Sequence, residues 1–152
     1  MKIFRFMSEN EFEKYKNGEE LINTTDHNKT GQKTNSVGFC FLNAKEFQPE
    51  YAAHFLSGIV GTGSILQKAR GLENMVCVVF ETDGKNLKRT YGRYARPRSV
   101  REIRAVVEAE AFFANEYCTT SYSKEKFKLL KYAKPIWFDW DYKHWDWKGK
   151  DE

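Results

Sequence analysis

The residues best suited to chemistry lie in one segment, residues 84–104, where arginines and lysines alternate with tyrosines. Eight cations there stand against a single acid, Glu102, so the segment carries +7 and leaves −3 for the rest of a chain whose net charge is +4. Arginine pairs with phosphate oxygens and tyrosine stacks on bases. The pattern predicts a site for a small anionic ligand, with a solvated loop of internally paired arginines as the alternative. The candidate contacts are Arg89, Tyr91, Arg93, Tyr94, Arg96 and Arg98.

A second set of candidate residues is scattered along the chain. Each member also has a simpler explanation: an edge-strand cation, the start of a strand, or acids that face solvent. Glu108 and Glu110 share one side of a predicted strand, whereas Glu116 begins a polar stretch. The set consists of Arg5, Thr34, Ser36, Glu108, Glu110 and Glu116.

Taken in chain order, these residues resemble the arginine–serine–glutamate branch of the ADP-ribosyltransferase fold. Arg5 stands on the first predicted strand, and the motif Thr34-Asn35-Ser36 opens a later strand where the family has Ser-Thr-Ser. A late glutamate follows. The chain also looks like short uncharacterised proteins of bacteria and their phages that begin with an Arg-Phe-Met-Ser segment, here residues 5–8.

The resemblance implies a role for each residue. Arg5 would hold a phosphate or ribose of NAD, while Thr34 and Ser36 would shape the pocket for the nicotinamide ribose. Glu116, or alternatively Glu110, would hydrogen-bond a ribose hydroxyl. Cleavage of the nicotinamide bond develops positive charge on the sugar, and a nearby carboxylate stabilises that charge.

Three functions follow as predictions. The first is recognition of an NAD- or ADP-ribose-type nucleotide, as in a small mono-ADP-ribosyltransferase. The second is a non-catalytic phage anti-defence protein that sequesters a nucleotide immune signal, of the cyclic ADP-ribose or cyclic dinucleotide type. The third is a module that binds nucleic acid or inhibits a protein. No metal cofactor is predicted, because no histidine or cysteine pair has the spacing of metal ligands.

Hydrophobic periodicity predicts the elements that would position these residues. Strands are expected at residues 2–7, 37–42, 75–82, 103–113, 114–120, 129–132 and 136–140. Ser8 and Glu11 form a capping box for a helix that buries Phe12 and Tyr15 and ends at Gly18. A second helix is expected at 49–56, and a turn or short helix at 123–126. Without βαβ alternation, the mixture predicts an α+β domain with a mostly antiparallel sheet, of the ADP-ribosyltransferase type by resemblance.

Length and composition define the class of protein. The 152 residues, 41% hydrophobic, suit a single domain at 1–152 with an aromatic tail at 140–152. A mean hydropathy of −0.70 and the lack of a long apolar run exclude a membrane-spanning chain. No signal-peptide pattern is present, and Cys40, Cys77 and Cys118 fit buried thiols. The expected location is the cytoplasm, of the host if a phage encodes the chain.

Four tryptophans lie in the last sixteen residues, at positions 137, 140, 145 and 147. So many aromatic residues are unusual in a disordered tail. The segment is therefore expected to fold back over the domain, to form a homo-oligomer or partner contact, or to stack on a ligand.

Overall fold

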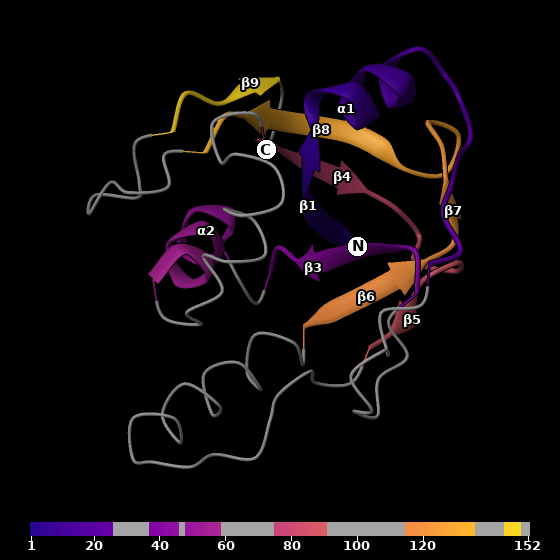
Figure 1. The fold of residues 1–152 in the computed structure, drawn as a ribbon, viewed down its shortest axis with the longest axis horizontal. Coiled ribbons are helices and arrows are strands. Elements are labelled where there is room, and N and C mark those ends of the chain that lie inside the picture. Colours follow the sequence, from indigo (N-terminus) through magenta and orange to yellow (C-terminus); the bar gives the residue numbers. More distant parts are fainter. Residues whose placement is uncertain (26–36, 46–47, 59–74, 91–114, 136–144, 150–152) are drawn as a thin grey trace.

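A seven-stranded antiparallel sheet, in the order β5-β6-β3-β1-β4-β8-β9, forms the centre of the computed structural model (Figure 1). The structure describes residues 1–25, 37–45, 48–58, 75–90, 115–135 and 145–149. A separate two-stranded sheet joins β2 to β7. The elements are β1 (Lys2–Ser8), α1 (Glu9–Lys16), β2 (Leu21–Ile22), β3 (Phe39–Asn43), α2 (Pro49–Gly58), β4 (Met75–Glu81), β5 (Lys88–Arg89), β6 (Glu116–Thr119), β7 (Ser121–Tyr122), β8 (Lys128–Ala133) and β9 (Lys148–Gly149).

This architecture confirms the prediction of an α+β domain with a mostly antiparallel sheet. β3 begins two residues later than expected, and α2 runs two residues further. The strands expected at 103–113 and 136–140 lie outside the described residues. No helix in the described ranges is long and apolar enough to cross a membrane.

The face of the sheet that packs against α2 carries the first hydrophobic layer. Phe4 of β1 lies opposite Leu42 in the ladder, and both pack with Val79 of β4. Ala52 and Ala53 of α2 close this layer. We call this side the α2 face.

The opposite side, which we call the α1 face, carries a second and more aromatic layer. Ile3 and Met7 of β1 point there because successive side chains of a strand alternate between faces. Phe12 and Tyr15 of α1 pack onto it. Its rings meet mainly edge to face, a geometry that adds roughly 0.5–1.5 kcal/mol per pair beyond simple burial. The aromatic residues of the cluster are Phe12, Tyr15, Phe39, Phe41, Phe80, Tyr122 and Phe127.

The strand pairings of β1 are unequal on its two sides. β1 pairs with β4 over its whole length, from Lys2 opposite Glu81 to Ser8 opposite Met75. Its pairing with β3 covers only two positions, Ile3 with Asn43 and Phe4 with Leu42. Beyond these positions β1 and β3 are no longer joined as a ladder.

Gly38, just before β3, contacts the residue that ends the first described range. Its amide donates to the carbonyl of Thr25 at 2.8 Å, so the residues on the two sides of segment 26–36 lie close together. Its φ of +68° is a conformation that favours glycine. A Cβ at this position would collide with the backbone oxygens of Asn23 and Thr119.

The described part of the C-terminal segment folds back onto the sheet. β9 pairs with β8, and Trp145 is buried in the layer on the α2 face. The indole N–H of Trp147 donates to Oε1 of Glu50 at 2.6 Å, and the Lys131 ammonium lies 4.2 Å from a Trp147 ring centroid. The fold-back prediction is confirmed for residues 145–149, whereas residues 137 and 140 fall outside the described ranges.

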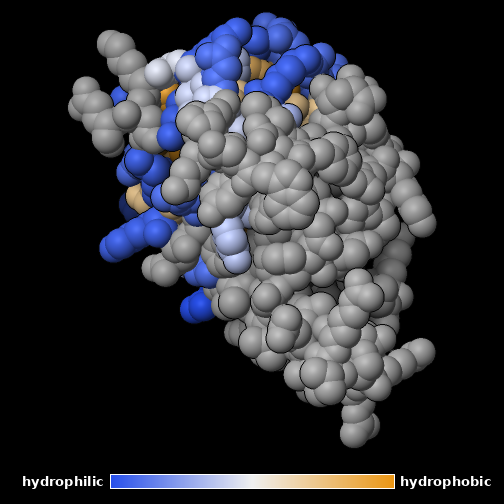
Figure 2. Space-filling model, turned by 90° about the vertical axis from the view of Figure 1, so that its left-hand side faces the viewer, coloured by the Kyte–Doolittle hydropathy of each residue, from blue (hydrophilic) through white to orange (hydrophobic). Residues whose placement is uncertain are grey.

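The surface formed by the described residues is mostly polar. Figure 2 shows one side of the molecule, on which hydrophilic residues cover most of the described surface and hydrophobic ones appear only between them. Among the described residues, the exposed large hydrophobic side chains are Ile22 and Tyr51. The apolar faces of the sheet are thus largely covered.

Candidate functional site

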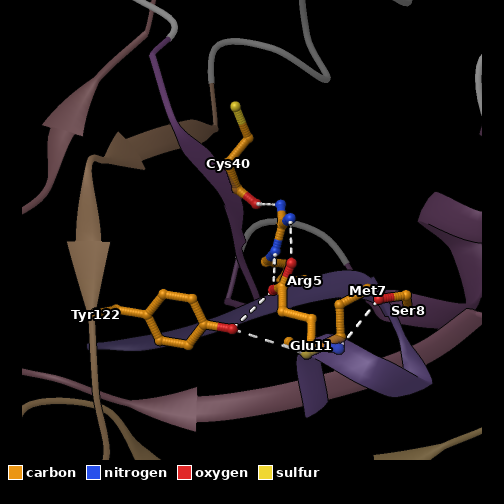
Figure 3. Close-up of polar contacts among 6 residues, drawn as sticks. All are labelled: Arg5, Met7, Ser8, Glu11, Cys40 and Tyr122. Atoms are coloured by element: carbon orange, nitrogen blue, oxygen red, sulfur yellow. Dashed lines mark hydrogen bonds and ion pairs between the residues drawn. The ribbon is translucent and has the colours of Figure 1, made fainter. Parts of the chain in front are cut away.

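Arg5 is the centre of a polar cluster on the α1 face (Figure 3). Its Nε donates to Oε2 of Glu11 at 2.7 Å and its Nη2 donates to Oε1 at 2.9 Å, which makes a two-pronged ion pair. Its Nη1 donates to the carbonyl of Cys40 at 3.2 Å. Arg5 and Glu11 keep only 15% and 13% of their side-chain surface exposed. The guanidinium therefore donates hydrogen bonds from Nε, Nη1 and Nη2 to groups inside the protein.

The sequence around Ser8 positions Glu11 for its contact with Arg5. Ser8 ends β1 and caps α1, since its hydroxyl accepts from the amide of Glu11 at 3.1 Å. This confirms the Ser8 half of the predicted capping box. The carboxylate of Glu11 binds Arg5 and also accepts from the hydroxyl of Tyr122 at 2.7 Å. Glu11 therefore links β1 to β7, and it also lies in the first turn of α1.

Burial and charge set the ionisation of this cluster. Burial alone would lower the pKa of Arg5, but the hydrogen bond and charge of Glu11 raise that pKa above its usual value, so Arg5 stays charged. Burial, with the adjacent Glu11 charge, raises the pKa of Tyr122 far above its ordinary value. Burial raises the pKa of Tyr15 to about 12.

Raising the pH above about 10 is expected to destabilise the fold, partly through Tyr122. An unfolded tyrosine ionises near pH 10, whereas folded Tyr122 keeps its proton to a higher pH. The contribution of Tyr122 to the free energy of unfolding is fully present below about pH 10. Above that pH it is lost by about 1.4 kcal/mol per pH unit. Denaturant unfolding of wild type and Tyr122→Phe between pH 8 and 11 measures the difference. Equal slopes against pH would contradict the assignment.

Glu116 on β6 forms a second polar site, linked to Thr90. The Thr90 hydroxyl donates to Oε1 of Glu116 at 3.0 Å, and the Thr90 amide donates to the Glu116 carbonyl at 3.0 Å. Glu116 is 5% exposed and Thr90 1%. Thr90 directly follows β5, which pairs with β6. The cation-rich segment is thus attached to the strand that carries Glu116.

Arg5 and Glu116 lie on opposite faces of the sheet. Glu116 is directly opposite Leu42, which belongs to the α2 face. The Arg5 guanidinium lies 5.2 Å from the ring centroid of Phe39 and 5.9 Å from that of Phe41, both on the α1 face. The structure brings their strands close, in the order β6-β3-β1, but does not bring the two side chains together.

The remaining predicted site residues are only partly placed. Arg89 lies on β5, exposed and opposite Tyr117 of β6. Thr34, Ser36, Tyr91, Arg93, Tyr94, Arg96, Arg98 and Glu110 lie outside the described residues, as does Glu108. Their roles therefore stay predictions.

Two pockets that described residues line lie away from these groups. One, of about 480 Å³, is bordered by Lys2, Glu50 and Lys131. The other, of about 610 Å³, lies between α1 and the β8–β9 edge. Arg5, Arg89 and Glu116 line neither of them. Over the described ranges, no cluster of three histidine, cysteine or acidic side chains is suited to a metal ion.

No family model matches the sequence, and no curated protein or solved structure is significantly similar to it. The candidate site therefore has to be interpreted from its own residues.

Sequence reasoning missed three residues of these clusters: Glu11, Thr90 and Tyr122. The Ser8-x-x-Glu11 spacing predicts only a capping role for Glu11, because that signal is local. Its partner Tyr122 is 111 residues away in the chain. One available signal was the alternation of Ile3, Arg5 and Met7, which places Arg5 among apolar neighbours on one face of β1.

Proposed function

We propose that this protein recognises an anionic nucleotide of the NAD or ADP-ribose type. The observation that carries the proposal is the Thr90–Glu116 link, because it attaches the cation-rich segment at 84–104 to a strand with a buried carboxylate. A nucleotide of this type offers phosphates to arginines and ribose hydroxyls to a carboxylate. Lys88 of this segment supports the proposal, because it lies opposite Cys118 and so shares the face of the sheet that carries Glu116.

The strand order supports an ADP-ribosyltransferase-type fold as part of this proposal. The three elements that the resemblance assigns to the site are the strand of Arg5, the strand after Thr34–Ser36, and the strand of Glu116. They are β1, β3 and β6, three successive neighbours in the sheet. Gly38, two residues after Ser36 in the sequence, lies beside β6 through its close approach to the carbonyl of Thr119.

In the catalytic form of the proposal, Glu116 hydrogen-bonds a ribose hydroxyl of NAD and stabilises positive charge on the sugar. The bond from the ribose C1′ to the nicotinamide nitrogen breaks, and nicotinamide leaves with the electron pair. A nucleophile on the acceptor then forms the new bond to C1′ and loses its proton to solvent. Glu110 is the alternative carboxylate.

A non-catalytic binder that sequesters a nucleotide signal is the second candidate, and one observation favours it. Arg5, the residue expected to hold NAD, donates instead to Glu11 and Cys40 on the face away from Glu116. Phosphate binding then depends on the cations at 84–104. Sequestration needs those cations and aromatic rings but no carboxylate at the sugar.

Mass spectrometry tests the proposal directly. The purified protein is denatured to release bound nucleotide, before and after incubation with NAD, and its titration with NAD, ADP-ribose, cyclic ADP-ribose and a cyclic dinucleotide is followed by calorimetry. We expect saturable binding of one of these ligands. Released nicotinamide indicates the transferase, whereas intact ligand indicates sequestration.

A different result would overturn the proposal. If none of the four nucleotides binds and the protein instead binds oligonucleotides with an affinity that falls steeply with salt, the cation-rich segment serves nucleic acid.

A further inference from the structure

Two cysteines face each other across neighbouring strands. Cys40 of β3 and Cys118 of β6 are directly opposite in the antiparallel register. Both are thiols in the structure, Cys40 half-buried and Cys118 fully buried. Directly opposite residues have their side chains on the same face of the sheet.

The backbone pattern shows which kind of pair they form. The amide of Asn43 donates to the carbonyl of Asn115 at 2.9 Å, so that pair occupies a hydrogen-bonded position of the ladder. Hydrogen-bonded and non-hydrogen-bonded pairs alternate, which makes Cys40–Cys118, three positions further, a non-hydrogen-bonded pair. The carbonyl of Cys40 agrees with this, since it points away from β6 and accepts from Arg5.

Non-hydrogen-bonded pairs bring side chains closest together. Their Cα atoms are about 4.5 Å apart, within the range of about 4.4–6.8 Å that a disulfide spans. Figure 3 shows the sulfur of Cys40 pointing away from the Arg5 guanidinium, consistent with the α2 face. Cys40 and Cys118 are therefore placed to bond without movement of the strands.

The third cysteine does not have this geometry. Cys77 lies on β4, opposite Phe6 of β1, and β1 separates β4 from β3. Two strand spacings amount to about 10 Å, beyond the limit of about 7 Å between the Cα atoms of a disulfide. Cys77 thus serves as an internal control.

We propose that Cys40 and Cys118 form a reversible disulfide by exchange with a low-molecular-weight disulfide such as oxidised glutathione. The partly exposed Cys40 loses its proton, and its thiolate attacks one glutathione sulfur and releases the first glutathione. The thiolate of Cys118 then attacks the Cys40 sulfur and releases the second. Two protein thiols lose two electrons and two protons in total, and the glutathione disulfide gains them.

This site is independent of the proposed function but lies beside it. Cys118 is two residues from Glu116 on the same face of β6, and its other neighbour across the ladder is Lys88 of β5. A disulfide there would tie the strand with Glu116 covalently to β3.

The test uses the full chain and counts thiols. Protein equilibrated with excess oxidised glutathione is denatured, alkylated with iodoacetamide and weighed intact. We expect three alkylated cysteines in the reduced wild type and one, Cys77, after oxidation, with a peptide that links Cys40 to Cys118. Oxidised Cys77→Ala should form the same link and carry no alkylated cysteine. Cys40→Ala and Cys118→Ala should form no intramolecular link.

Several results would overturn the proposal: three alkylated cysteines in the oxidised wild type, a lasting glutathione adduct at Cys40, or a link that includes Cys77. Circular dichroism of each variant establishes that it is folded. Because Cys40 is half-buried, Cys40→Ala keeps the comparison valid even if the fully buried Cys118→Ala does not fold.

Discussion

Replacing Arg5 with methionine is expected to lower the free energy of unfolding by about 3–5 kcal/mol, the cost of leaving one partner of a buried ion pair without the other. The Glu11 carboxylate, 13% exposed, would lose both hydrogen bonds from the guanidinium and keep the one from Tyr122. The carbonyl of Cys40 would lose its donor from Arg5 as well. Urea unfolding at pH 7 measures the change.

Two companion variants separate the buried pair from a general charge effect. Lys134→Met removes an exposed ion pair with Glu9, whose side chains are 66% and 54% exposed, and should cost less than about 1 kcal/mol. The double variant Arg5→Met/Glu11→Leu should recover part of the lost stability, because no unpaired charge then stays buried. If Arg5→Met costs no more than Lys134→Met, Arg5 is not a structural residue and its assignment to NAD regains support.

Glu116→Gln is expected to slow nicotinamide release from NAD by about 10²–10³-fold in the catalytic form of the proposed function. The amide keeps an oxygen that can accept from Thr90, so the fold around β5 and β6 is retained. It lacks the negative charge that stabilises the sugar in the transition state. Binding of NAD should change little. A nicotinamide assay with calorimetry on the same protein measures both quantities.

The matched control is Glu81→Gln, at a carboxylate that pairs with the N-terminus and is 49% exposed. It should keep the wild-type rate. Glu110→Gln tests the alternative carboxylate in the same assay. If Glu116→Gln and Glu110→Gln both release nicotinamide at the full rate, the proposed chemistry is wrong. If the wild type releases none and returns its ligand intact on denaturation, the protein sequesters the nucleotide.

The elements of this fold were predictable where the signal is local. Ser8 caps α1 through the amide three residues later, and Gly18 follows the helix with a positive φ of 80°. The apolar run of β4 identified a strand that is buried from Met75 to Phe80. Their partners were not predictable, because the neighbours of β1 lie more than thirty residues away and no local pattern specifies which strands pair.

The candidate site shows the same limit of prediction from local sequence. The order of Arg5, Thr34–Ser36 and Glu116 along the chain does not specify which strands pair, and the structure shows that β1, β3 and β6 are neighbours. The same order says nothing about which side of a strand a residue faces. That depends on the register with the next strand, which places Glu116 opposite Leu42 and Arg5 opposite Val78.

The short pairing between β1 and β3 divides the seven-stranded sheet into two blocks of strands. β1, β4 and β8 form a larger block, in which β1 and β4 pair at seven positions and β4 and β8 at five, whereas β3, β6 and β5 form a smaller block. Backbone contacts between β1 and the β3 segment are two residue pairs and the hydrogen bond from the Ala44 amide to the Lys2 carbonyl, to which Arg5 adds its bond to Cys40. Glu116, Thr90 and the cysteine pair all lie in the smaller block. Segments held by fewer backbone pairs open at lower free energy, so we expect the amide hydrogens of the smaller block to exchange with solvent faster than those of β1 and β4, as native-state hydrogen exchange would measure.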